Sequence, residues 1–217
     1  MKAFKIMPRD LHNLGDIVLT TKVNYGSWTG RFLGSKVLAD AVVEVCSESE
    51  ITFAEAISTL TAFQAPFIRD VQLPPSMTME QAAILHPLAE SAPPLAAEFG
   101  GTFWEALYEC VRRQERPTCP SRQKSSFACR ELGQLRDYCN AHKQNQMYDK
   151  LACEIDIAGC DVAFDVDTSI LDAIDGNMTY QTARPHILRY WDQSKTSSPI
   201  MEILLQGQYS LGKVVEL

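Results

Sequence analysis

Apolar and polar side chains alternate along residues 151–158, and this is the clearest pattern in the chain. A period of two predicts a half-buried strand in this segment. Gly159 then turns the chain into a second predicted strand over 161–166. Shorter β-rich segments predict three further strands, at 4–7, 16–23 and 126–129.

Two glycines interrupt the last β-rich stretch of the chain. The apolar runs 200–205 and 213–217 predict strands, and Gly207 and Gly212 lie between them. Because glycine readily adopts turn conformations, we expect these two strands to form a terminal hairpin.

Helical periodicity fills most of the chain between the strands. Capping boxes, in which a threonine precedes a glutamate or glutamine by three residues, predict helix starts at Thr52, Thr78 and Thr102. Prolines are expected to end the second and third of these helices, at Pro87 and Pro117. Apolar residues at helical spacing predict a helix over 37–46. The helix that starts after Thr52 is expected to span 53–64, and a polar helix over 131–145 and a helix over 179–192 are also predicted.

The order of these elements predicts an α+β protein, with strands at both ends of the chain and helices between them. The 217 residues suffice for one domain over 1–217. Helical patterns at about 35–95, followed by a proline-containing linker at 91–94, predict a helical insertion between the first strands and the rest.

Composition narrows the functional classes. A hydrophobic fraction of 46% and a charged fraction of 22% are ordinary for a soluble protein. No apolar run is long enough to span a bilayer, and the first ten residues lack the apolar core of a signal peptide. We therefore expect a cytoplasmic protein that binds no membrane. The net charge of -7 disfavours a broad nucleic-acid footprint, although a local cationic patch is compatible with it.

The cysteines point to thiols rather than to disulfides or a metal site. There are seven of them in a chain without an export signal, which predicts reduced side chains. Cys139 and His142 form a lone C-x-x-H that lacks the paired ligand spacing of zinc sites, so we expect no metal centre.

The candidate chemistry begins with the stretch 109–132. It holds five of the chain's arginines and a Pro-Ser-Arg turn that ends at Arg122, and a short strand with Phe127 follows. Fixed cations, a rigid turn and an aromatic ring predict a binding site for an anionic ligand that contains a planar ring. Glu202 is a second candidate, because a carboxylate in an apolar strand is costly to bury without partners. The alternatives are that Glu202 faces solvent and that Arg122 is a structural arginine bound to a carboxylate.

Two sets of residues then carry a resemblance to a known family. The central set is Glu109-x-x-Arg112, then Pro117-x-x-Pro120-Ser121-Arg122-x-x-Ser125-Ser126-Phe127. The C-terminal set is Tyr190-Trp191, Met201-Glu202-Ile203-Leu204, Gly207 and Val214-Val215-Glu216. Together they resemble a bacterial domain family grouped with the ADP-ribosyltransferase superfamily, over about residues 1–30 and 100–217. The resemblance implies a split antiparallel β core with peripheral helices, to which the helical insertion is added.

The resemblance implies an enzyme that moves ADP-ribose from NAD, as substrate, to a macromolecule. Glu202 would stabilise the ribosyl cation that forms when nicotinamide leaves. Arg122 would bind the diphosphate. Ser125 or Ser126 would hydrogen-bond ribose or nicotinamide, and Phe127 would pack on the nicotinamide ring.

The superfamily also places a basic residue on its first strand to hold the ribose. Arg9 is our choice for this role, with Lys5 and His12 as competitors. Position 200 is isoleucine, where arginine-modifying relatives usually carry glutamate or glutamine. A different protein side chain or a nucleic acid, such as messenger RNA, is therefore the expected acceptor.

The likeness also suggests a biological setting, a toxin–antitoxin or toxin–antitoxin–chaperone system that defends against phage. Its partners would be an antitoxin and a chaperone. Two other kinds of protein fit the same sequence. One is an NAD glycohydrolase or a catalytically degenerate module that binds NAD or nucleic acid, and the other is a nucleic-acid-binding regulator that uses the arginines of 112–130.

Overall fold

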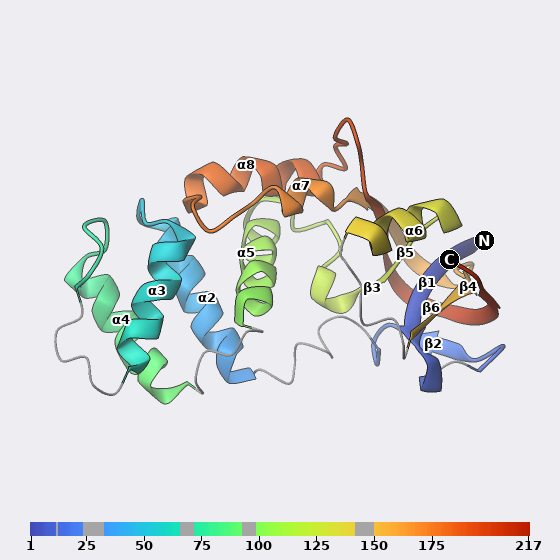
Figure 1. Cartoon of the computed structure of the whole chain (residues 1–217), viewed down its shortest axis with the longest axis horizontal. Helices are drawn as coiled ribbons and strands as arrows, with labels where there is room; N and C mark the ends of the chain where they lie inside the picture. Colours follow the sequence, from blue (N-terminus) through green and yellow to red (C-terminus); the bar gives the residue numbers. More distant parts are fainter. Residues whose placement is uncertain (12, 24–32, 66–71, 93–98, 142–149) are drawn as a thin grey trace. The chain divides into compact units, whose positions relative to one another are not determined.

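The computed structural model describes residues 1–11, 13–23, 33–65, 72–92, 99–141 and 150–217 (Figure 1). It contains helices and an antiparallel sheet, as the predicted α+β class requires. The chain forms two compact units. The sheet unit comprises Met1–Trp28, Thr118–Leu171 and Tyr190–Leu217, and the helical unit comprises Thr29–Pro117 and Asp172–Arg189.

One long strand, β6 (Met201–Val215), organises the sheet unit. Every strand pair in the described sheet is antiparallel. The strand β1 (Lys2–Pro8) pairs with β4, and all the others pair with β6. Those others are β2 (Ile17–Leu19), β3 (Ser126–Ala128), β4 (Lys150–Asp156) and β5 (Cys160–Asp167).

The strand β1 has a second neighbour beside β4. The backbone N–H of Phe4 donates to the carbonyl oxygen of Cys129 at 2.8 Å, and the N–H of Cys129 donates back at 2.8 Å. The strands β1, β4, β6 and β3 therefore surround one core. Its buried side chains include Met7, Ala128, Ile155, Ile203, Leu205, Tyr209 and Leu211. This arrangement brings the first strand close to the segment that follows the Pro-Ser-Arg turn.

The predicted C-terminal hairpin is wrong, because β6 continues through both glycines without a turn. Gly207 has a φ of +110°, and a Cβ there would lie 2.7 Å from the backbone nitrogen of Asp161. A Cβ on Gly212 would lie 2.7 Å from the carbonyl oxygen of Glu154. The two glycines allow the neighbouring strands to approach β6 closely. In the sequence, a glycine in this role looks the same as a glycine in a turn.

Replacing Gly207 by alanine is expected to lower the free energy of unfolding by about 2 kcal/mol, since a positive φ and a backbone overlap both oppose a Cβ. Urea unfolding followed by circular dichroism would measure the change. Gly133→Ala is the matched control, because a Cβ there meets nothing within 4 Å and alanine favours the helix. An equal stability of the two variants would contradict this account of Gly207.

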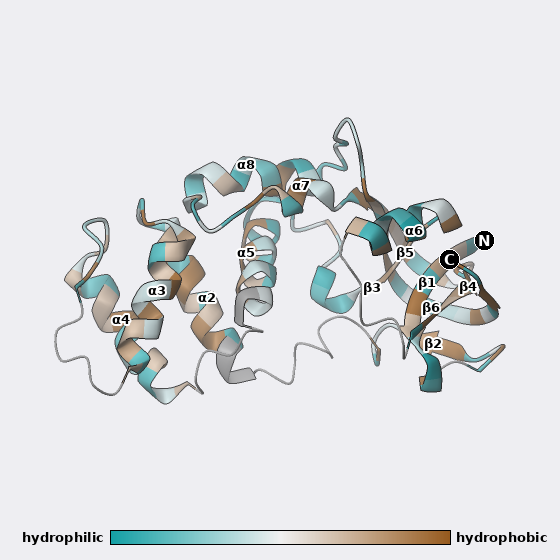
Figure 2. Cartoon of the chain, in the orientation of Figure 1, coloured by the Kyte–Doolittle hydropathy of each residue, from teal (hydrophilic) through white to brown (hydrophobic). Residues whose placement is uncertain are grey.

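The helical unit includes α2 (Leu33–Ser47), α3 (Phe53–Gln64), α4 (Met79–Ser91) and α5 (Phe99–Glu115). The capping boxes at Thr52 and Thr78 are both formed, and they start α3 and α4 as predicted. Figure 2 shows the hydrophobic positions along these helices. Their buried side chains include Leu38, Val42, Phe53, Leu60, Leu85, Phe103, Leu107 and Val111.

Two predicted helix boundaries are wrong. The helix α4 runs through Pro87 to Ser91, and Leu85 and Ala89 on either side of the proline are fully buried. Burial of both side chains offsets the backbone hydrogen bond that proline removes. The helix α5 begins at Phe99, so Thr102 lies within it instead of capping it, and its side chain is buried.

The remaining helices and strands are of the type that the sequence predicted, but some differ from the prediction in length. The strand β2 is shorter than predicted, because the N–H groups of Lys22 and Val23 both donate to the carbonyl oxygen of Leu19. The helix α6 (Leu132–Ala141) starts as predicted, and residues 142–145 lie outside the described part of the chain. The others are η1 (Arg9–Leu11), η3 (Arg122–Lys124), α7 (Ser169–Asp172) and α8 (Tyr180–Trp191). Among the described residues, none of the helices has the length and apolar character to cross a bilayer.

Candidate functional site

Glu202 lies near the start of β6 and is 2% exposed. The alternative that it faces solvent is therefore wrong. Its strand pairs with β5 on one side, where Val166 is the partner of Glu202, and with β3 on the other side one residue further along. A buried carboxylate needs partners, and these come from two distant segments of the chain.

The first partner is Arg122, which begins the short helix η3 directly after the Pro-Ser turn. Its Nη1 donates to Oε1 of Glu202 at 2.6 Å, and the Arg122 residue is 9% exposed. The guanidinium carbon lies 4.7 Å from the centre of the Phe127 ring, within the range of a cation–π contact. The structure thus brings together the arginine and the glutamate that the sequence analysis selected.

The second partner, Tyr190, was missed as a site residue by sequence analysis. Its hydroxyl donates to Oε1 of Glu202 at 3.0 Å and accepts a hydrogen bond from Nη1 of Arg122. Tyr190 is fully buried near the end of α8. Neither its position at the end of a helix nor its neighbour Trp191 signals such a role. We call these three residues the Arg122–Tyr190–Glu202 cluster.

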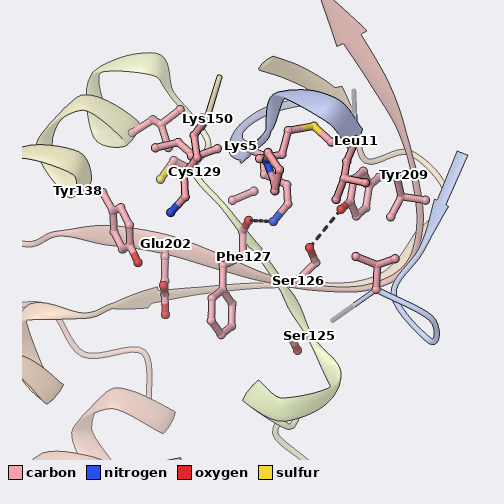
Figure 3. Close-up of a pocket in the computed structure, with 17 residues that line it drawn as sticks. Lys5, Leu11, Ser125, Ser126, Phe127, Cys129, Tyr138, Lys150, Glu202 and Tyr209 are labelled. Atoms are coloured by element: carbon pink, nitrogen blue, oxygen red, sulfur yellow. Dashed lines mark hydrogen bonds between the residues drawn. The ribbon is translucent and has the colours of Figure 1, made fainter. Parts of the chain in front are cut away.

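A cavity of about 440 Å³ adjoins this cluster in the sheet unit, and Glu202 is part of its lining. Lys5, Ser126, Phe127 and Tyr209 also line it. In Figure 3, Glu202 and Tyr138 lie toward one end and Leu11 and Tyr209 toward the other, with Lys5 between them. The lining also includes the apolar side chains of Met7, Leu11, Val18 and Val23. A ligand with a polar part and an apolar part would match this lining.

Lys5 supplies a cation within the cavity. Its Nζ donates to the carbonyl oxygen of Phe127 at 2.7 Å, a bond drawn in Figure 3. Burial lowers the pKa of Lys5 from 10.5 to about 8, although the Cys153, Cys129 and Glu202 side chains act in the opposite direction. An amine with this pKa is mostly protonated at neutral pH and loses its proton in mildly basic solution.

The other two first-strand candidates lie elsewhere. Arg9 is exposed on η1 and is not among the residues that line the cavity. His12 lies outside the described residues. Of the three basic residues considered from sequence, Lys5 is the one that the structure places at the cavity.

The predicted serines have different surroundings. Ser125 is fully buried, and its hydroxyl donates to the carbonyl oxygen of Ser121 at 2.8 Å and accepts from Nε2 of Gln206 at 3.1 Å. The Ser126 hydroxyl lies 3.2 Å from that of Tyr209 (Figure 3). Ser125 is therefore well satisfied by the protein, whereas Ser126 and Tyr209 present a pair of hydroxyls at the cavity.

Cys129 lies in the cavity lining next to β3 and is 2% exposed. Burial, with a smaller contribution from the neighbouring Glu202 carboxylate, raises the pKa of its thiol to about 12. The thiol is protonated at neutral pH, and it is therefore a poor nucleophile or metal ligand. In the part of the chain that the structure describes, no three His, Cys, Asp or Glu side chains gather as metal ligands. His142 of the C-x-x-H lies outside that part.

A family model described as "Protein of unknown function (DUF2441)" matches residues 43–216. The chain belongs to this family. The DUF2441 match includes the whole Arg122–Tyr190–Glu202 cluster, and it also includes α3 and α4 from the stretch predicted as an insertion. It begins after β1, so Lys5 lies outside it. No curated protein matches the chain.

The remaining arginines of the stretch 109–132 are mostly engaged within this DUF2441 chain. Arg112 forms an ion pair with Glu109 at 2.7 Å, and Arg130 binds Asp165 through two hydrogen bonds of 2.9 Å. Arg112 belongs to the helical unit, whereas Arg122 and Arg130 belong to the sheet unit. Paired arginines spread over two units do not support the alternative of a nucleic-acid-binding regulator built on residues 112–130.

The Glu202 carboxylate is anchored through one of its oxygens. Oε1 accepts hydrogen bonds from both Arg122 and Tyr190. Arg122 is not among the residues that line the cavity. Arg122 therefore binds Glu202 without lining the cavity. This agrees with the alternative that Arg122 is a structural arginine bound to a carboxylate. The chemistry that faces the cavity is therefore one anchored carboxylate, the Lys5 amine, two hydroxyls and an aromatic ring.

Proposed function

We propose that this protein is an NAD-dependent mono-ADP-ribosyltransferase whose NAD site is the cavity beside Glu202. The observation that carries the proposal is the 2.6 Å contact between Glu202 and Arg122 at the edge of that cavity. The two residues come from the two motifs that resemble the ADP-ribosyltransferase superfamily, and 80 positions separate them in the chain. An ADP-ribosyltransferase-like split β core is part of the same proposal, and the antiparallel pairing of β3 and β5 with β6 is compatible with it.

The physical role of Glu202 follows from the chemistry of the bond that breaks. When nicotinamide leaves, the ribose carbon develops positive charge, as in glycoside cleavage. A fixed carboxylate beside that carbon stabilises the charge without having to reorganise. Arg122 and Tyr190 hold Oε1, so Oε2 is the atom that would face the ribose and its 2′-hydroxyl.

The proposal changes the role of Arg122 from that expected in the sequence analysis. Its guanidinium is already bound to Glu202, so we assign it to positioning the carboxylate and not to the diphosphate. Lys150 lines the cavity, and it is better placed to bind a phosphate oxygen. The Ser126 and Tyr209 hydroxyls would bind ribose or carboxamide, and Phe127 offers a ring for nicotinamide to pack on.

The acceptor is proposed to be a macromolecule other than an arginine side chain, because position 200 is isoleucine. Messenger RNA is one such acceptor, through a transient encounter that needs no broad cationic surface. The setting as a toxin with an antitoxin and a chaperone is supported by the resemblance of the two motifs.

Incubation of the purified protein with NAD labelled in its adenylate half tests the proposal. Label on RNA or protein together with released nicotinamide is the expected result. Release of nicotinamide with free ADP-ribose as the sole labelled product would favour a glycohydrolase. Binding of intact NAD without turnover would favour a degenerate module, and the absence of binding would overturn the proposal.

A further inference from the structure

The transfer of ADP-ribose to an acceptor requires a group that takes the acceptor's proton. Glu202 is poorly placed to supply it. Oε1 already accepts two hydrogen bonds, and in the proposed function Oε2 binds the ribose 2′-hydroxyl. The residue two positions earlier on the chain is Ile200, which carries no polar group. The base must therefore come from another part of the cavity.

Lys5 is a basic group of this cavity whose amine is held in place by the backbone. It comes from β1, lines the same cavity as Glu202, and interacts electrostatically with it. The carbonyl oxygen of Phe127 holds its Nζ at 2.7 Å, so the amine has a defined position. A neutral amine keeps one lone pair after donating this hydrogen bond, and that lone pair can accept a proton.

We propose that Lys5 is the general base that removes the proton from the acceptor during the transfer of ADP-ribose. This inference rests on the proposed function. The bond between ribose and nicotinamide breaks, and its electron pair leaves with neutral nicotinamide. The acceptor atom bonds to the ribose carbon, and its proton moves to Nζ of Lys5, which becomes an ammonium.

This role restricts the acceptor to one chemical class. A base is useful for a neutral O–H or N–H group, which must lose a proton as it bonds to the ribose. A carboxylate acceptor has no proton to lose. We therefore assign the acceptor to hydroxyl or neutral N–H groups, which occur in nucleic acids and in several protein side chains.

The charge of Lys5 also predicts the dependence of turnover on pH. The titratable groups that act on it are Cys153 of β4, Cys129 next to β3 and Glu202 of β6. Burial outweighs them and lowers the pKa to about 8. Below this value Lys5 holds its proton and cannot act as a base. Turnover is therefore expected to rise by about tenfold per pH unit up to the pKa and to level off above it.

Lys5→Arg tests the inference, because arginine keeps the positive charge but does not release its proton. Nicotinamide release with water as acceptor, and the Kd for NAD, would be measured from pH 6 to pH 10. We expect kcat to fall by about a hundredfold, the Kd to stay within about threefold, and the inflection near pH 8 to disappear. Lys2→Arg on the same strand is the matched control, since Lys2 is largely exposed and pairs with Glu154.

Lys5→Ala adds a second readout that does not depend on fitting an arginine into the cavity. Ethylamine in solution should restore part of its turnover if the missing group is a base. The inference is overturned if Lys5→Arg turns over at the parent rate, or if the parent shows no inflection between pH 7 and 9. A parent that releases no nicotinamide at any pH overturns the proposed function, and the inference falls with it.

Discussion

Replacement of Glu202 by glutamine is expected to lower NAD turnover by about a thousandfold, because the fixed negative charge beside the ribose is lost. Glutamine keeps the shape and the hydrogen-bonding capacity of the side chain. Nicotinamide release at saturating NAD would measure the change in kcat. The loss is expected in kcat and much less in KM, since the carboxylate acts mainly on the charge that develops in the transition state.

The fold must be followed in the same experiment. The substitution removes only a charge. The structure shows that this charge is the partner of a buried guanidinium. We therefore expect the free energy of unfolding to fall by about 3 kcal/mol, and turnover should be assayed well below the Tm of the variant.

Glu154→Gln is the matched control for Glu202. Glu154 is also a strand glutamate and also has a cationic partner, Lys2, at 2.8 Å, but it does not line the cavity. Its glutamine variant should turn over NAD at the parent rate. Parent-like turnover of a folded Glu202→Gln protein would remove this residue from the catalytic machinery.

Replacement of Arg122 by methionine is expected to lower the free energy of unfolding by about 3–5 kcal/mol, because it leaves the Glu202 carboxylate buried without its cation. Urea unfolding of the intact chain would measure the loss. Arg136→Met provides the comparison, since Arg136 is exposed on α6 and its loss should change stability by less than about 0.5 kcal/mol.

A double variant separates the structural role of the pair from its catalytic role. Arg122→Met combined with Glu202→Leu removes both charges and keeps apolar volume, so most of the lost stability should return. The double variant should remain inactive, because the carboxylate is absent. If Arg122→Met alone were as stable as the parent, the ion pair would not be what holds Glu202 in place.

Local signals in the sequence were reliable where neighbouring residues decide the structure. The helix α3 has the predicted bounds 53–64, and the alternation over 151–158 located β4, which spans Lys150–Asp156. The same reasoning failed at Gly207 and Gly212. These glycines lack a Cβ and so allow β5 and β4 to lie close to β6, and both of those strands are distant from the glycines in the chain.

The candidate site divides in a similar way. Motif resemblance selected Glu202 and Arg122, and the structure places them in contact. No local pattern pointed to Tyr190 as a partner, and none favoured Lys5 over Arg9. These assignments depend on which side chains lie beside the Glu202 carboxylate and the cavity, and long-range strand pairing determines that.

The sequence by itself therefore determined the α+β class, most of the helices and strands, and a short set of residues with suitable chemistry. Tertiary structure decided which of those residues meet. It buried Glu202 against Arg122 and Tyr190, and it brought the Lys5 amine of the first strand to the same cavity. The physical reason is that helix caps and strand alternation are short-range effects. Burial, ion pairing and a shifted pKa arise only when distant segments exclude water from the same place.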